Sequence, residues 1–83
     1  MRDIPYNPDP EAPLTWRWSK RDGKPYPQFT CKCGARSCLT DWTITSDGEV
    51  SPSVDCLGDE FKDGNGCKFH DYIRLLRYKE VSP

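Results

Sequence analysis

The sequence predicts a small α+β domain stabilised by a metal ion, with β-hairpins followed by a C-terminal helix. Three observations support this. Only 35% of the 83 residues are hydrophobic, and eight are proline, so a core alone would supply only roughly 3–5 kcal/mol. Cysteine and histidine side chains stand in two close-spaced pairs. Apolar residues alternate along most of the chain but follow helical spacing near its end.

The elements follow in chain order. Residues 1–13 contain four prolines, which remove amide donors and favour extended backbone. We expect a flexible proline-rich arm here and a zinc-binding domain over residues 14–83. Leu14, Trp16 and Trp18 then alternate with polar residues, which predicts a strand with one aromatic face. A turn at residues 20–24 and a returning strand at residues 28–33 complete a hairpin, and the prolines at 25 and 27 favour a sheet edge.

A second hairpin is predicted between residues 40 and 54. Residues 40–45 and 49–54 are rich in β-branched side chains, and Asp47-Gly48 between them is a typical turn dipeptide. The acidic, glycine-containing loop at residues 57–66 does not have the spacing of a calcium-binding loop.

The last segment, residues 69–79, is predicted to be a helix. Its apolar side chains follow i, i+3, i+4 and i+7 spacing at Phe69, Tyr72, Ile73 and Leu76. Asn65 could cap such a helix at its N-terminal end. Aromatic and β-branched residues also suit a strand, so an all-β fold with a C-terminal strand is the alternative.

Four metal-binding side chains form the two pairs: Cys31 with Cys33, and Cys67 with His70. Two ligands, a gap and two more ligands are typical of a tetrahedral zinc site. We therefore predict that these four residues hold a structural Zn²⁺. Structural zinc contributes about 10–16 kcal/mol of apparent binding energy in small domains, so the metal would be a requirement for folding.

The first pair requires a backbone bend. Residues i and i+2 of a flat strand lie about 6.6 Å apart, whereas two sulfurs on one zinc lie about 3.8 Å apart. Gly34 would allow the chain to bend directly after Cys33. Cys38 could take the place of Cys31 or Cys33. Cys56 could also join the site, but it lacks a close-spaced mate and is more simply read as a small buried hydrophobe.

These motifs resemble a family of small uncharacterised bacterial and phage zinc proteins. That family carries a Cys-x-Cys-Gly run, a Trp-containing strand, a Ser-Pro-Ser-Val-like segment and a Cys-x-x-His followed by aromatic and Ile positions. The corresponding parts here are residues 31–34, Trp42, residues 51–54 and residues 67–73. The resemblance implies zinc but no activity. The order of the ligands is also similar to that of treble-clef zinc folds.

No catalytic motif is present, so we expect a protein that is not an enzyme, with no small-molecule substrate. The single histidine is assigned to the metal, and neither a His-Glu-x-x-His helix nor a deaminase signature occurs. A dithiol redox centre at the Cys-x-Cys pair is a lesser alternative, with Lys32 lowering the pKa of a thiol.

Charge is segregated along the chain. Residues 14–36 carry six basic side chains and one acidic one, whereas residues 37–63 carry seven acidic and one basic. The basic segment contains aromatic residues, so residues 16–36 could form a nucleic-acid-binding surface. The net charge of −1 and the acidic block oppose phosphate binding.

Binding to a protein partner is therefore the preferred interpretation, and a phage-encoded modulator or inhibitor of a host complex would have this size and composition. The candidate partner-binding residues are Arg17, Lys20, Arg21 and Lys24. No signal peptide and no membrane span is visible in the sequence. We expect a cytoplasmic protein, where cysteine pairs serve as metal ligands rather than disulfides.

Overall fold

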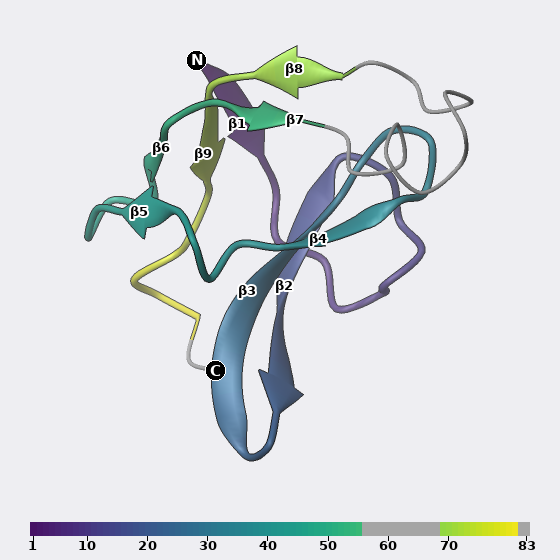
Figure 1. Cartoon of the computed structure of the whole chain (residues 1–83), viewed down its shortest axis with the longest axis vertical. Helices are drawn as coiled ribbons and strands as arrows, with labels where there is room; N and C mark the ends of the chain where they lie inside the picture. Colours follow the sequence, from purple (N-terminus) through teal and green to yellow (C-terminus); the bar gives the residue numbers. More distant parts are fainter. Residues whose placement is uncertain (56–68, 82–83) are drawn as a thin grey trace.

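The computed structural model describes residues 1–55 and 69–81 and contains only β-strands and turns within them (Figure 1). The predicted α+β class with a C-terminal helix is therefore wrong, and the all-β alternative fits. None of the described residues forms a helix that could cross a membrane. The strands are β1 (Arg2–Ile4), β2 (Thr15–Arg21), β3 (Lys24–Thr30), β4 (Arg36–Cys38), β5 (Thr43–Ile44), β6 (Val50–Ser51), β7 (Val54–Asp55), β8 (His70–Asp71) and β9 (Ile73–Leu75).

The largest sheet has the order β2-β3-β4, and the long β2–β3 hairpin extends away from the other strands (Figure 1). Its two strands pair from Thr15↔Thr30 to Arg21↔Lys24. Asp22 and Gly23 between them have φ values of +52° and +78°, and positive φ at both positions is what a type I′ hairpin turn requires. The predicted hairpin is therefore present, but its returning strand is Lys24–Thr30 rather than residues 28–33.

One face of this sheet forms part of the core. Trp16 and Phe29 lie directly opposite each other in β2 and β3, and both are fully buried. The Trp16 indole nitrogen donates a hydrogen bond to the Leu76 carbonyl at 2.9 Å, which ties the sheet to the C-terminal segment. The buried hydrophobic residues among those described are Ile4, Trp16, Phe29, Cys31, Leu39, Val50, Val54, Phe69, Ile73 and Leu75.

The segment predicted to be a helix contains β8 and β9, followed by turns. Burial has a period of two here, because Phe69, Ile73 and Leu75 are buried. Tyr72, which a helix would have placed on the buried stripe, is 59% exposed. The helical spacing was coincidental, since apolar residues at 69 and 73 satisfy both patterns until a neighbouring strand selects one.

That neighbouring strand comes from the N-terminus. β1 pairs with β9 in parallel, with Ile4 opposite Leu75, and Ile4 is fully buried. Farther along, the Trp16 amide donates to the Pro5 carbonyl at 3.0 Å and the Asn7 amide donates to the Trp16 carbonyl at 2.9 Å. The segment expected to be a flexible arm is thus held against the domain. Its prolines leave enough free amides for pairing, and Ile4 supplies the apolar side chain that anchors it.

The second predicted hairpin is present but short. β5 and β6 pair antiparallel at two positions, Thr43↔Ser51 and Ile44↔Val50. Gly48 has a φ of +89°, and an added Cβ would collide with the Leu75 carbonyl oxygen. A glycine is therefore required both for the turn and for its contact with β9. β7 leaves this hairpin and pairs with β8. The acidic loop at residues 57–66 and the predicted helix cap Asn65 lie outside the described residues.

Candidate functional site

The first predicted ligand pair lies in a tight turn after β3. The Gly34 amide donates to the Cys31 carbonyl at 2.9 Å, and the Cys31 amide donates to the Ala35 carbonyl at 2.8 Å. Gly34 has a φ of +93°. The expected bend of the chain at Gly34 is therefore present. Cys31 is fully buried and Cys33 is exposed, so the turn runs from the core to the surface.

The second predicted pair is only partly described. Cys67 and Cys56 lie outside the described residues. His70 begins β8, where its Nε2 is hydrogen-bonded to the Ser53 hydroxyl and lies 3.6 Å from Asp55 Oδ1. Its neighbour Phe69 packs in the core against Phe29, with ring centroids 5.5 Å apart.

Cys38, the predicted substitute ligand, belongs to a different face of the sheet. It lies opposite Gln28 in β4, and its Sγ is 3.4 Å from the Thr40 hydroxyl. The next residue back along β4, Ser37, faces the core opposite Phe29 and is fully buried. The structure therefore brings Cys38 together with Thr40, whereas Cys31 lies in the core.

The chemistry of the first pair fits zinc. Two thiols on a bent turn are the usual half of a structural site. Within the described part of the chain, the Ser37 hydroxyl, on the same buried face as Phe29, has no hydrogen-bond partner. Among the described residues, however, no group of three His, Cys, Asp or Glu side chains is arranged to hold a metal.

Ser53, His70 and Asp55 are the residue types of a hydrolytic triad, but their arrangement differs from one. Both the Ser53 hydroxyl and the Asp55 carboxylate contact the same ring nitrogen, Nε2. In a triad the carboxylate orients the ring through Nδ1 and leaves Nε2 to the nucleophile. This cluster was not anticipated from the sequence, because β7 and β8 are distant in the chain.

Basic side chains fall into two groups according to their partners. Four of them, near the two ends of the chain, each have a carboxylate within 4 Å. The pairs are Arg2–Asp71, Arg74–Asp3, Arg77–Glu80 and Lys79–Asp47, with distances of 3.1, 2.9, 3.5 and 3.4 Å. The hydrogen bond from Arg2 holds the pKa of Asp71 below its usual range.

The second group, the described basic side chains of residues 17–36, has no carboxylate partner. These six are Arg17, Lys20, Arg21, Lys24, Lys32 and Arg36. Four were predicted to bind a partner. Arg21 and Lys24 are brought together at the hairpin tip, directly opposite each other. Arg17 shares their face and is hydrogen-bonded to Gln28 at 3.1 Å. Lys20 lies on the other face, opposite Pro25.

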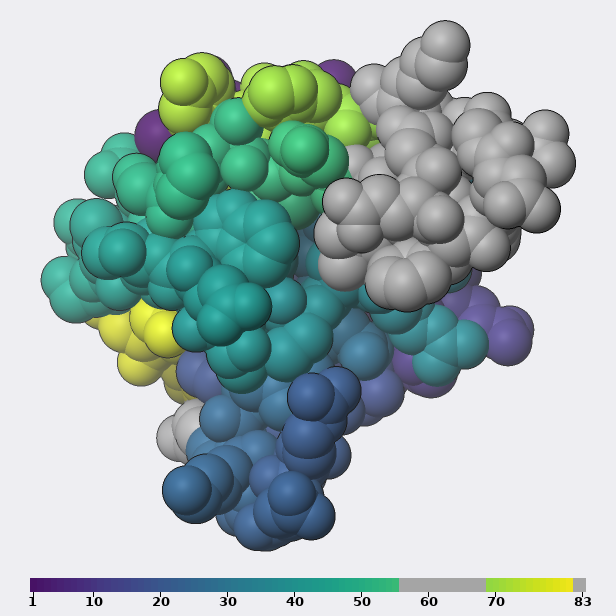
Figure 2. Space-filling view, in the orientation of Figure 1, coloured from purple at the N-terminus to yellow at the C-terminus, as the bar shows by residue number. Residues whose placement is uncertain are grey.

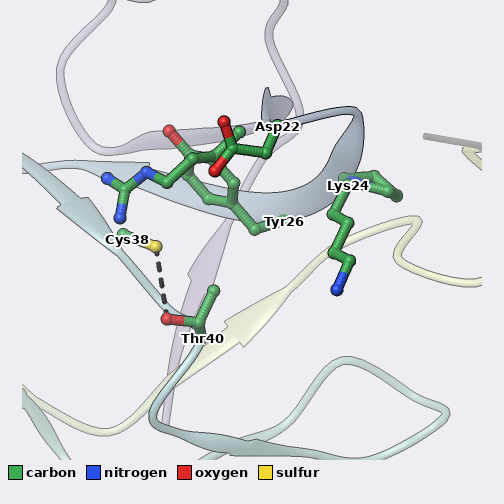
Figure 3. Close-up of a pocket in the computed structure, with 7 residues that line it drawn as sticks. Asp22, Lys24, Tyr26, Cys38 and Thr40 are labelled. Carbon is green, nitrogen blue, oxygen red and sulfur yellow. Dashed lines mark hydrogen bonds between the residues drawn. The ribbon is translucent and has the colours of Figure 1, made fainter.

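A cavity of about 260 Å³ lies beside the hairpin tip. The residues that line it are Arg21, Asp22, Lys24, Pro25, Tyr26, Cys38 and Thr40 (Figure 3). A second cavity of about 450 Å³ shares Pro25, Tyr26 and Thr40 and extends to Trp18 and Trp42. The prolines at 25 and 27 indicated a sheet edge, but nothing in the sequence predicted the cavity. Figure 2 shows the hairpin tip projecting below the segment near residue 40.

The cavity exists because β4 is shorter than its neighbour. β4 pairs with β3 only from Gln28 to Thr30, and the chain then turns away after the Leu39 amide donates to the Pro27 carbonyl at 3.0 Å. The open edge of β3 that remains contains Pro25, which cannot donate to another strand. Pro25 therefore offers no amide donor toward this space.

Comparison of the chain with protein-family models, with curated proteins and with solved structures gave no match.

Proposed function

We propose that this chain is a small zinc-stabilised binding module that acts by binding another protein through the β2–β3 hairpin. The observation that carries the proposal is the separation of the basic side chains. Every described arginine and lysine outside residues 17–36 has a carboxylate partner, and none of those within it has one. A surface that concentrates one sign of charge attracts and orients a partner of the opposite sign.

The hairpin tip carries an electrostatic cost that a partner would relieve. Arg21 and Lys24 are a directly opposed cross-strand pair, and like charges in that position are destabilising. Asp22 lies between them in the turn, but it is not within ion-pair distance of either. Both side chains are exposed and therefore available to a carboxylate on another molecule.

In this proposal Cys31, Cys33, Cys67 and His70 hold the Zn²⁺. The ion would supply a structural cross-link between the turn after β3 and strand β8, since four protein ligands leave no open position for chemistry. The bend at Gly34 supports the first half of this set. His70 would have to exchange its contact with Ser53 for the metal, and such a change of rotamer is available to a side chain that is 63% exposed.

A protein partner is favoured over nucleic acid by how the aromatic rings are used. Bases bind to open ring faces. The Trp18 ring packs against Trp16 and Tyr78, with centroids 5.5 and 5.4 Å apart, and its indole nitrogen donates to the Val81 carbonyl at 2.8 Å. The Arg21 guanidinium lies over the Tyr26 ring at 5.6 Å. The rings of Trp18 and Tyr26 are therefore already in contact with other side chains of the domain.

Capture from a cell lysate tests the proposal, with wild-type protein, Arg21→Glu and a matched charge reversal, Arg36→Glu. Arg36 belongs to β4, outside the β2–β3 hairpin, and is exposed opposite Thr30, about 13 Å along β3 from Tyr26. We expect proteins that are retained after nuclease treatment, lost from Arg21→Glu and kept by Arg36→Glu. Capture that disappears with nuclease and falls steeply with salt would establish nucleic-acid binding instead.

A further inference from the structure

The cavity beside the hairpin tip combines apolar walls with two cations, Arg21 and Lys24, and with the carboxylate of Asp22, which forms an ion pair with neither. Tyr26 and Pro25 form part of its wall on β3, and Arg21 and Lys24 stand at its margin. Figure 3 shows Cys38 and Thr40 on one side of this space and Lys24 on the other. The cavity therefore offers both a place for an apolar group and charges for an acidic one.

The size of the cavity limits what it can hold. At about 260 Å³ it is smaller than the roughly 300–1,000 Å³ of sites that enclose a drug-sized ligand. Its walls come from the β2–β3 hairpin on one side and from Cys38, the last residue of β4, and Thr40 on the other. One side chain of a larger partner fits these dimensions, and anchoring by a single buried side chain is how many protein interfaces concentrate their affinity.

The backbone next to the cavity excludes one binding mode. A partner strand that adds to a sheet edge needs alternating donors and acceptors from that edge. Pro25, at the exposed edge of β3, has no amide hydrogen, and the Pro27 carbonyl already accepts the Leu39 amide. Recognition here must therefore come mainly from side chains.

We propose that this cavity seats one aromatic or large apolar side chain of an acidic peptide segment, whose flanking carboxylates pair with Arg21 and Lys24. The inference rests on the proposed function, because it names the chemistry of the protein partner. The Arg21 guanidinium is positioned by its contact with the Tyr26 ring at 5.6 Å, so its N–H groups are held near the cavity before the peptide arrives. Acidic residues also relieve the repulsion between Arg21 and Lys24.

NMR titration of ¹⁵N-labelled protein with three synthetic peptides and an oligonucleotide tests the inference. The peptides are Asp-Glu-Phe-Asp-Glu, its charge inverse Lys-Arg-Phe-Lys-Arg, and the anchor-free Asp-Glu-Gly-Asp-Glu; the oligonucleotide is a short oligo-dT. We expect only the first peptide to shift the amide signals of Tyr26, Cys38 and Thr40 strongly. Arg21→Glu should weaken its binding at least about tenfold, and Arg36→Glu should change it by less than about twofold.

Other results would overturn the inference. Equal binding of the anchor-free peptide would show that the cavity seats no side chain. Tighter binding of the charge-inverted peptide or of oligo-dT would show that the partner is not an acidic peptide. If Arg21→Glu loses captured proteins from the lysate but the Phe-containing acidic peptide leaves the cavity signals unchanged, this inference fails while the proposed function stands. An unchanged spectrum away from the tip confirms that each variant is folded.

Discussion

Replacing Ile4 with alanine tests whether the N-terminal segment is part of the folded domain. Ile4 is fully buried in the parallel pair of β1 and β9, and its carbonyl accepts a hydrogen bond from the Leu76 amide at 2.9 Å. Truncating a buried isoleucine to alanine costs about 2–5 kcal/mol. Small domains are stable by only about 5–15 kcal/mol, so this one side chain accounts for a large share.

The effect should be visible as a change in Tm. For a domain of 60–100 residues, each kcal/mol shifts Tm by roughly 4–8 °C, so Ile4→Ala should lower Tm by at least about 8 °C. Thermal unfolding followed by circular dichroism measures this. If the alanine variant does not fold, Ile4→Val still gives a measurable Tm, with an expected loss of stability of about 0.5–1.5 kcal/mol. Glu11→Ala, at an exposed position in the same segment, should stay within about 0.5 kcal/mol of wild type.

The opposite result would refute the reasoning. An Ile4→Ala variant with the Tm of the wild type would mean that residues 1–13 do not contribute to the core, as expected for a flexible arm. The parallel pairing of β1 with β9 would then have no energetic role.

Three further predictions concern the turn, the ion pairs and the metal. Gly48→Ala should lower stability by more than about 1 kcal/mol, because alanine is strained at this positive φ; denaturant unfolding with an unchanged midpoint would contradict the turn geometry. Arg2→Ala should raise the pKa of Asp71 toward the ordinary value of 3.8. Because the pKa of Asp71 is lowered in the folded state, the ion pair stabilises the fold above pH 3.8, and this stabilisation is lost as the pH falls through the folded-state pKa. NMR titration of the Asp71 carboxyl group measures its pKa in both proteins. An unchanged pKa in Arg2→Ala would show that Arg2 is not the cause of the shift. Purified wild-type protein should contain about one zinc per chain by elemental analysis. Cys33→Ser should lose the zinc and Cys38→Ser should retain it. The reverse result would show that Cys38, and not Cys33, is the ligand.

The features that follow from neighbouring residues could be predicted from the sequence. The β2–β3 hairpin depends on alternation and on an Asp-Gly turn whose positive φ values are local preferences. The bend after Cys33 depends on one glycine. The concentration of basic residues in the segment 17–36 can be read directly from the sequence. Each of these needs only a short stretch of chain.

Two features of the candidate site depended on distant contacts instead. Whether a cation is neutralised is decided by where its nearest carboxylate lies, and the pairs Arg2–Asp71 and Arg74–Asp3 join residues about seventy positions apart. The cavity depends on β4 ending before it covers the Pro25 edge of β3. Neither the end of a strand nor an ion pair across the molecule is encoded in local spacing.

The sequence by itself determined the hairpin, its turn and the chemical character of its tip. The tertiary structure alone decided that the last segment is a strand and that the first is not a free arm. The physical reason is the same for both: β1 and β9 satisfy each other's backbone groups and bury Ile4 against Ile73 and Leu75, and a strand without a partner carries no such signal in its own residues.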